Sequence, residues 1–310
     1  MSRSPKVDMH IHIYPSAEIG LSDKAYEIWE YGTHSAVHFS RCAGTVPELL
    51  ESMRAAGVSK GVVLIYFMGR FRKQAAIAQL GGAASAEALK AVDARLLREL
   101  EDGNRWGCEV SRAHPEIATF VTVDIGFQSA EAAAAHVRDM VENHGARGLK
   151  LHGSMQGISM ADERLWPTYA LCERLGLPIL GHAGPDRDGQ GYAEPKAFEA
   201  MLAAFPKLKV VLAHMGGAAW RQSASVASRH PNAFFDCSEI IEWTGSPHAP
   251  TDEQLVGLIR EVGIDRVMMG SDFPWYDLDH TVERVMSLPG LSAGEREAII
   301  GTNAMRILGL

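Results

Sequence analysis

The strongest constraint on the fold is a regular alternation of two kinds of segment along the 310 residues. Short runs of apolar and β-branched residues recur, and each is followed by a segment with helical periodicity, which is typical of parallel βα units. Eight strands are expected, at residues 7–13, 61–67, 117–124, 148–153, 178–184, 209–215, 233–238 and 266–272. Eight such units predict one α/β domain over residues 1–310, folded as a single (β/α)8 TIM barrel.

An open, doubly wound sheet is the competing architecture, because it also alternates strands and helices. The glycine-rich phosphate-binding pattern of such folds is absent after the first expected strand, which ends in His10-Ile11-His12. Polar residues also recur at the ends of later strands, where a barrel carries its active site. The sequence therefore favours the closed barrel.

Helix boundaries agree with this reading. Capping boxes, in which a hydroxyl residue precedes Glu or Gln by three positions, predict three helix starts, at Thr45 with Glu48, Thr251 with Gln254 and Ser292 with Glu295. Gly57 and Gly176 precede expected strands and suit helix ends with positive φ.

Two insertions interrupt the alternation, at residues 14–44 after the first strand and 68–85 after the second. Both follow the carboxyl end of a strand, so we expect both to overhang the mouth of the active site. Each can serve as a lid or as a subunit contact. Because barrels with long insertions often pair through them, we expect a homodimer.

Charge and cysteine content exclude several classes of protein. The formal net charge of -8 and the lack of a basic run argue against a nucleic-acid partner. No apolar segment is long enough to span a membrane, and the first residues do not resemble a secretory signal, so we expect a cytoplasmic enzyme acting on a small molecule. The four cysteines are widely separated, without the CxxC spacing of a zinc site.

Histidines and a carboxylate stand at the ends of the expected strands. His10 and His12 lie two residues apart in a strand and therefore point to the same side, where a metal can satisfy both imidazoles. The fifth, sixth and eighth strands end near single polar residues, His182, His214 and Asp272. Hydrogen-bonded strand ends would explain each alone, but together they favour a metal site.

With these motifs the chain resembles the amidohydrolase superfamily, in the branch related to aminocarboxymuconate semialdehyde decarboxylase. The resemblance runs from Val7 to about Leu308. It rests on five motifs, Asp8-Met9-His10-Ile11-His12, Lys150-Leu151-His152, Gly181-His182-Ala183-Gly184, Ala213-His214-Met215-Gly216-Gly217 and Gly270-Ser271-Asp272-Phe273-Pro274.

The resemblance implies one divalent metal held by His10, His12, His182 and Asp272. Zinc is the first expectation, with manganese and iron as alternatives that the ligand types also allow. His214 falls at the position of the general base, with a fifth ligand or a ligand to a second metal as its competing roles. His214 and Asp272 are the expected catalytic residues.

Three residues are candidates for substrate binding. Lys150 lies where some superfamily members carry a carboxylated lysine between two metals, but the branch resembled is generally mononuclear, so we expect Lys150 to orient substrate or a neighbouring side chain. His152 shares its face of the strand and can join the pocket. Arg70, in the second insertion, could pair with a substrate carboxylate.

Three functions follow from these expectations. The first is a metal-dependent hydrolase that opens an amide, lactone or ester with an activated water and His214 as base. The alternative is nonoxidative decarboxylation of a small aromatic or unsaturated carboxylic acid, which an arginine reaching the pocket would favour. The third is a noncatalytic metal-binding barrel. The presence of His214 as an additional base beside the metal ligands argues against it.

Overall fold

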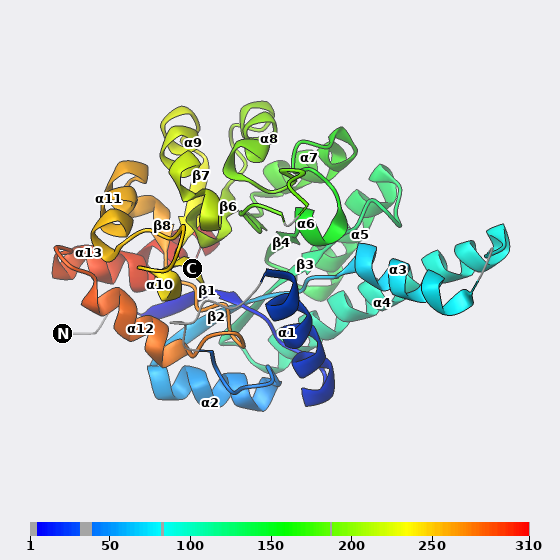
Figure 1. Ribbon diagram of the computed structural model, residues 1–310, viewed down its shortest axis with the longest axis horizontal. Coiled ribbons are helices and arrows are strands. Elements are labelled where there is room, and N and C mark those ends of the chain that lie inside the picture. Colours follow the sequence, from blue (N-terminus) through cyan, green and yellow to red (C-terminus); the bar gives the residue numbers. More distant parts are fainter. Residues whose placement is uncertain (1–4, 32–38, 82–83, 187, 310) are drawn as a thin grey trace.

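The protein is a (β/α)8 barrel, as predicted (Figure 1). A computed structural model describes residues 5–31, 39–81, 84–186 and 188–309. The parallel strands neighbour one another in chain order, β1 Lys6–Ile11, β2 Val58–Leu64, β3 Ile117–Thr122, β4 Gly148–Leu151, β5 Ile179–Gly181, β6 Val210–Leu212, β7 Ala233–Asp236 and β8 Val267–Met268. Backbone bonds close the ring between β8 and β1, from Met9 N to Met269 O at 3.0 Å and from Asp272 N to His10 O at 2.8 Å.

All eight expected strands are present, although each ends earlier than expected at its carboxyl end. In β6 and β8, the strand pairing ends before His214 and Asp272, because the backbone turns at these residues. His214 and Asp272 have φ of 57° and 60°, in the left-handed region that no regular strand uses. His10 and Lys150 remain within β1 and β4, whereas the other polar residues of the pattern, His12, His152, His182, His214 and Asp272, lie beyond the ends of their strands.

Helices surround the barrel on its outer side, and many of their boundaries follow the expected signals. The predicted capping boxes at Thr251 and Ser292 form, and Glu48 accepts a hydrogen bond from the Thr45 N–H at 2.8 Å. Gly57 and Gly176 end helices at φ of 67° and 68°. The helices are α1 Ala17–Tyr31, α2 Val46–Ala56, α3 Gly69–Leu80, α4 Ala86–Ala113, α5 Ala130–His144, α6 Gly153–Gln156, α7 Trp166–Leu175, α8 Glu199–Ala204, α9 Ser223–Arg229, α10 Ile240–Trp243, α11 Asp252–Val262, α12 Leu278–Ser287, α13 Ala293–Glu297 and α14 Asn303–Leu308.

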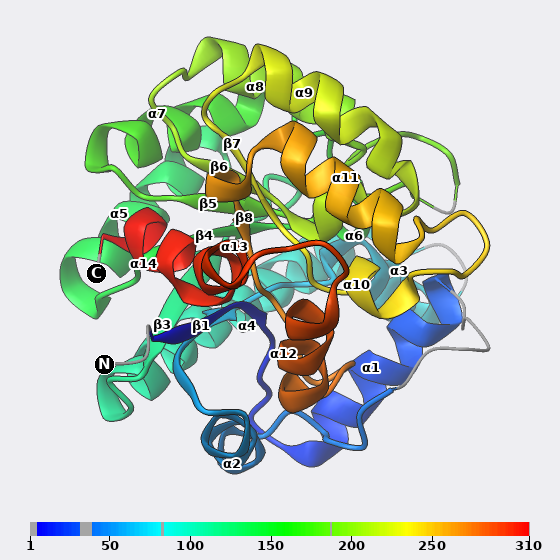
Figure 2. The same cartoon turned by 90° about the vertical axis from the view of Figure 1, so that its left-hand side faces the viewer.

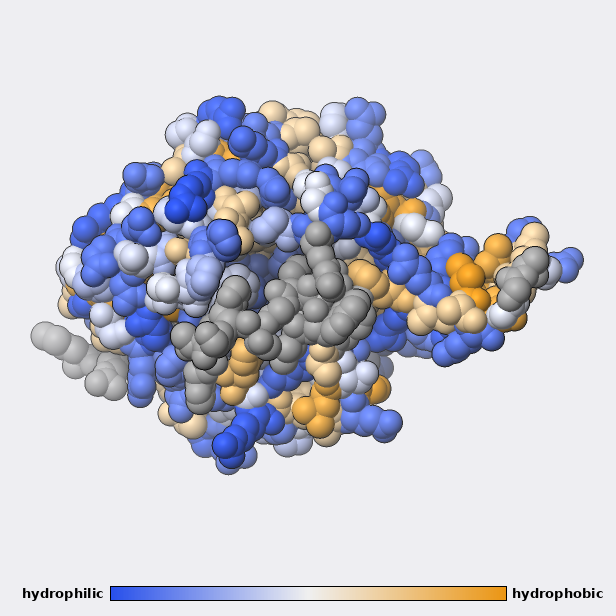
Figure 3. Space-filling view, viewed as in Figure 1, coloured by the Kyte–Doolittle hydropathy of each residue, from blue (hydrophilic) through white to orange (hydrophobic). Residues whose placement is uncertain are grey.

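The two insertions have different structures. Residues 14–44 contain α1, and their segment 32–38 lies outside the described residues. The second insertion contains α3, which pairs with α4 in an arm that projects beyond the ring of helices (Figure 1). Apolar side chains gather toward the far end of this arm, where α3 ends at the half-exposed Leu80 (Figure 3). The expected homodimer stays a prediction.

Alternate residues of the strands pack into two apolar clusters. One fills the barrel interior with side chains such as Met9, Leu180 and Met268, and α14 contributes Ala304 and Ile307 to it. The other lies between strands and helices. In β1 the register shifts between Asp8 and Ile11, so Met9 joins the inner cluster but Ile11 joins the outer one. His10 and His12 consequently face the interior above the inner cluster.

The inner cluster is covered at one end by the carboxyl-terminal helix. Figure 2 shows α14 beside β1, near both chain ends, and α14 packs on β1 and β8. The opposite end, where the strands finish, stays open for a pocket. Across the described ranges, no helix is both long and apolar enough to cross a membrane.

Candidate active site

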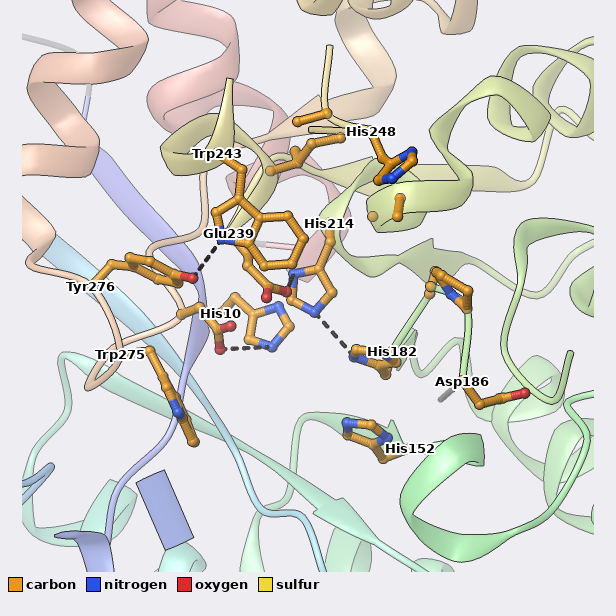
Figure 4. A pocket seen from close by; sticks show the side chains of 18 of the residues that line it. His10, His152, His182, Asp186, His214, Glu239, Trp243, His248, Trp275 and Tyr276 are labelled. Carbon is orange, nitrogen blue, oxygen red and sulfur yellow. Dashed lines mark hydrogen bonds and ion pairs between the residues drawn. The ribbon is translucent and has the colours of Figure 1, made fainter. Parts of the chain in front are cut away.

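A cavity of about 300 Å³ opens at the carboxyl ends of the strands (Figure 4). Seven residues expected at the site from the sequence line it, namely His10, His12, Lys150, His152, His182, His214 and Asp272. Its walls include four aromatic side chains, Phe39, Trp243, Trp275 and Tyr276, beside small apolar residues such as Ala183 and Ala218. The cavity thus joins a polar floor to apolar sides, the usual composition of a small-molecule site.

Two imidazoles converge on one carboxylate oxygen. The Nε2 atoms of His10 and His12 lie 3.5 Å and 3.4 Å from Asp272 Oδ1. The other nitrogen of each ring faces an acceptor, since His12 Nδ1 lies 2.9 Å from the Leu64 carbonyl and His10 Nδ1 lies 3.1 Å from Asp236 Oδ2. Both rings therefore carry their hydrogen on Nδ1 and present Nε2 lone pairs to a negatively charged oxygen. Imidazole nitrogens and a carboxylate oxygen are donors that suit a divalent cation.

The backbone holds Asp272 in this position. Its φ of 60° lies in the left-handed region, which aspartate and asparagine tolerate better than most residues. The Asp272 N–H donates to the His10 carbonyl at 2.8 Å, so the segment that closes the barrel also brings the carboxylate against the histidine pair.

His214 lies beside this group. The centroid of the His214 ring is 4.9 Å from that of His10. The backbone N–H of His214 donates to Asp236 Oδ1 at 3.0 Å. Its Nε2 lies 3.2 Å from His182 Nδ1. Among the described residues, His10, His214 and Asp272 form the group whose ligand atoms all lie within 4.8 Å of one another. The geometry therefore leaves open both expected roles of His214, base and additional ligand.

His182 and His152 form a stacked pair. Their ring centroids are 3.9 Å apart and their planes differ by 9°, and His214 links the pair to the His10 group. His152 Nδ1 also accepts a hydrogen bond from the Met155 N–H at 3.4 Å. The structure thus brings His152 into the pocket and gives it a helix-capping contact at the start of α6 as well.

Burial sets the protonation of the site. It lowers the pKa of His10, His152 and His182 well below the ordinary histidine value, and it lowers the pKa of His12 and His214 in the same direction. Burial alone would raise the pKa of Asp272, but the neighbouring histidines outweigh it and hold this pKa low. Neutral imidazoles beside an ionised carboxylate are the forms that bind a metal.

The two predicted cationic substrate ligands have different positions. Lys150 is 1% exposed and its Nζ lies 3.3 Å from His10 Nε2, at the floor of the cavity. Arg70, on α3, is absent from the residues that line the cavity and pairs with Asp188 at 3.1 Å. Among the described lining residues no arginine occurs, so Lys150 provides the cationic side chain of the floor.

The sequence analysis missed a group of polar residues at the end of β7. Asp236 accepts hydrogen bonds from the His214 and Ser238 N–H groups, and Glu239 lines the pocket with its Oε2 3.4 Å from His214 Nδ1. The signal was present, because Asp236-Cys237-Ser238-Glu239 ends the seventh expected strand as His and Asp end the others. Asp8 was also missed as a site residue, and its Oδ1 accepts from the His10 and Ser271 N–H groups.

Comparisons with known proteins agree with this geometry. The amidohydrolase family model matches residues 7–310. The 2-amino-3-carboxymuconate-6-semialdehyde decarboxylase of Dictyostelium discoideum is 25% identical over 213 residues, and the match covers 59% of this chain and 59% of that protein. The chain therefore spans under two thirds of the curated relative that it matches.

Solved structures of decarboxylases share the fold. The 5-carboxyvanillate decarboxylase of Sphingomonas paucimobilis has a TM-score of 0.68 and 17% identity, with 99% of each chain covered. A dihydroxybenzoic acid decarboxylase from a Polaromonas species, solved with manganese and 2-nitroresorcinol, has a TM-score of 0.65 and 15% identity, with 99% of this chain and 97% of that chain covered.

Proposed function

The chain belongs to the amidohydrolase family, and from this membership and the geometry of the site we propose that it is a metal-dependent decarboxylase of a small aromatic or unsaturated carboxylic acid. The observation that carries the proposal is a buried lysine, Lys150, at the floor of an aromatic-walled cavity beside a histidine and carboxylate cluster. A flat acid would fill this space with its carboxylate on the lysine and its ring between the aromatic walls.

The names of the relatives support decarboxylation over hydrolysis, which was the first expectation from the sequence. The curated relative and both structural relatives described above are decarboxylases. Their low identity makes the support one of class, and the acid itself is not inferred from them. Hydrolysis stays as the second candidate, because the pocket has the base His214 and, among its described lining residues, lacks the arginine expected for an acid clamp.

We infer that one divalent metal is held by His10, His12, His182 and Asp272. When bound, it would act as a Lewis acid and would compensate negative charge on the substrate. Zinc and manganese both suit imidazole and carboxylate ligands, and manganese is the metal in one structural relative. The buried, neutral histidines and the ionised Asp272 would favour its binding.

The chain's own residues would then act on the acid as follows. The Lys150 ammonium binds and orients the carboxylate. Trp243, Trp275 and Tyr276 position the ring or alkene and exclude water. His214 takes up a proton on Nε2 and delivers it to the carbon that loses carbon dioxide, so that one C–C bond breaks, one C–H bond forms and one proton is consumed.

The proposal is tested by supplying the metal-loaded protein in D₂O with a panel of hydroxybenzoates and unsaturated acids beside a panel of lactones, esters and amides. Decarboxylation is expected, with carbon dioxide released and deuterium found by NMR at the vacated carbon. Turnover confined to the lactone, ester or amide panel would overturn the proposal and support the hydrolase.

Lys150→Met should raise KM or abolish turnover, because the buried cation is lost. Lys207→Met is the matched control, since the Lys207 side chain is exposed and lies outside the pocket lining. Equal behaviour of the two variants would contradict the role given to Lys150.

A further inference from the structure

One hydroxyl lies between the predicted metal ligand His10 and the predicted base His214. Ser238 Oγ is 3.1 Å from His10 Nδ1 and 2.9 Å from His214 Nδ1. It also makes a short hydrogen bond to Asp236 Oδ1. Ser238 is fully buried, so no bulk water competes for these contacts.

Of the three groups around the Ser238 hydroxyl, only the Asp236 carboxylate can accept a hydrogen bond but not donate one. A serine hydroxyl has one hydrogen and two lone pairs, whereas an ionised carboxylate only accepts. The hydrogen must therefore lie toward Asp236, and the two lone pairs are left for the two rings. Each ring must then donate from Nδ1 to the Ser238 oxygen.

The other neighbours of both Nδ1 atoms lead to the same assignment. Asp236 Oδ2 lies 3.1 Å from His10 Nδ1, while the Ser238 carbonyl and Glu239 Oε2 lie 3.3 Å and 3.4 Å from His214 Nδ1. All of these oxygens accept hydrogen bonds. The Nε2 atoms of both rings consequently carry no hydrogen. The Nε2 lone pair of His10 lies 3.3 Å from Lys150 Nζ and that of His214 lies 3.2 Å from His182 Nδ1, and these are the lone pairs that His10 would use for the metal and His214 for the proton.

We propose that Ser238 is a positioning residue that fixes His10 and His214 in the same tautomer through one hydroxyl oriented by Asp236, and so prepares metal binding and proton transfer together. For the role of His214 this inference rests on the proposed function. The tautomers themselves are a property of the chain without metal or substrate, so they can be measured independently of any reaction.

Because Ser238 contacts both rings, its loss should have an effect that the loss of a contact to one ring would not have. A residue that supports only a ligand would change metal affinity, and a residue that supports only the base would change kcat. Loss of the Ser238 hydroxyl should change both, because one oxygen contacts both rings. Outer hydrogen-bond partners of metal-binding histidines typically contribute 10–100-fold to metal affinity or activity, so effects of about that size are expected.

The test compares Ser238→Ala and Ser238→Cys with the wild type in three measurements. Long-range ¹H–¹⁵N NMR of the metal-free, ¹⁵N-histidine-labelled protein reports the tautomer of each ring, with His10 and His214 assigned from His10→Gln and His214→Gln. Competition with a chelator gives the dissociation constant for zinc and for manganese. Steady-state kinetics at saturating metal separate kcat from KM.

Both rings should report hydrogen on Nδ1 in the wild type. In both variants the remaining acceptors, Asp236, Glu239 and the backbone carbonyl of residue 238, still favour this tautomer, so a minor share of the Nε2–H form should appear in each ring. The metal dissociation constant should rise and kcat at saturating metal should fall, each about 10–100-fold, with a smaller change in KM. Ser238→Ala reduces the side-chain volume, whereas Ser238→Cys slightly increases it and leaves only a weak donor and acceptor. Matching losses in the two variants would therefore assign the effect to hydrogen bonding and not to packing.

Ser223→Ala is the control, because Ser223 is equally buried and donates to the Met215 carbonyl at 2.8 Å outside the pocket lining. It should leave both tautomers unchanged. Unchanged tautomers in Ser238→Ala, or a change in metal affinity alone, would overturn the inference. If the protein decarboxylates nothing, the proposed function fails, while the NMR and metal measurements still decide the tautomer assignment.

Discussion

The two ends of the barrel are built from the same strands but from opposite kinds of side chain. Toward the amino ends of the strands, Val7, Leu180 and Met268 pack with α14 in the inner apolar cluster. Toward the carboxyl ends, buried histidines and carboxylates face one another around the cavity. In β5 the change takes only two residues, from Leu180 to His182 on the same face.

This difference indicates that one end of each strand stabilises the fold and the other end carries the polar residues of the site. Apolar burial stabilises the fold, whereas buried polar groups cost free energy unless they are hydrogen-bonded or bind an ion. The polar end reduces that cost with contacts such as those from Asp236 to the His214 and Ser238 N–H groups. We therefore expect substitutions at one end to change metal binding and substitutions at the other end to change stability.

The largest expected effect is loss of metal from Asp272→Asn. Asparagine keeps the shape and tolerates the φ of 60°, but it removes the charge on which His10 and His12 converge. Metal affinity should fall by at least about 100-fold, the upper range for outer partners, because a direct ligand is altered. Chelator competition measures the affinity, and urea unfolding of the metal-free variant should show only a modest loss of free energy, from the histidine contacts that hold the pKa of Asp272 low.

The matched control is Asp139→Asn on α5, where the carboxylate is about half exposed. It should bind metal like the wild type. A metal-free Asp272→Asn protein that unfolds much more easily than the wild type would break the division between the two ends.

The opposite result is expected from Leu180→Ala in the inner apolar cluster. Leu180 is fully buried, so removing its side chain should lower the free energy of unfolding by about 2–5 kcal/mol through lost burial and a residual cavity. The folded fraction should still bind one metal with unchanged affinity. Denaturant unfolding and metal titration measure the two quantities on the same sample.

Leu175→Ala, at a leucine that is 41% exposed, controls for the loss of a leucine as such and should change stability little. If Leu180→Ala instead lowered metal affinity as much as Asp272→Asn, the two ends would act as one cooperative unit.

Many features of the two ends of the barrel could be predicted from the sequence, and the features that could not be predicted have physical causes. The eight strands follow from short apolar runs that alternate with helical segments, and the gathering of His10, His12, Lys150, His182 and Asp272 follows from their places near the carboxyl ends of those runs. The alternation of strand and helix segments is visible in the local sequence, so these features could be predicted without knowing the shape of the loops.

The contacts between strands could not be predicted in the same way. Ser238 reaches both His10 and His214 only because the chain turns through a positive φ at His214 and Glu239 after β6 and β7. Arg70 lies outside the pocket lining because its helix leaves the barrel in the arm and its guanidinium meets Asp188. Such turns and helix directions depend on tertiary packing, which periodicity does not contain.

The smallest expected effect concerns Asp124, a carboxylate at the polar end that does not line the cavity. Its Oδ1 accepts from the Gly126 N–H at 2.8 Å, while Oδ2 has no hydrogen-bond partner within the described part of the chain. Burial raises the pKa of Asp124 from 3.8 to about 6. This carboxylate therefore lacks the compensation that the site residues have, and its charge should cost stability.

The sign of the pH dependence follows from the raised pKa. Well below the unfolded pKa of 3.8, Asp124 is protonated in both states. As the pH rises through 3.8 toward 6, the unfolded state releases this proton first, so the unfolded state gains stability. The unfolding free energy of the wild type relative to Asp124→Asn should thus fall by roughly 1–3 kcal/mol between pH 4 and pH 6 and stay level above. Urea unfolding across this range measures it, with the exposed Asp102→Asn as control. A difference that stays flat or rises with pH would mean that Asp124 is compensated like the carboxylates of the pocket.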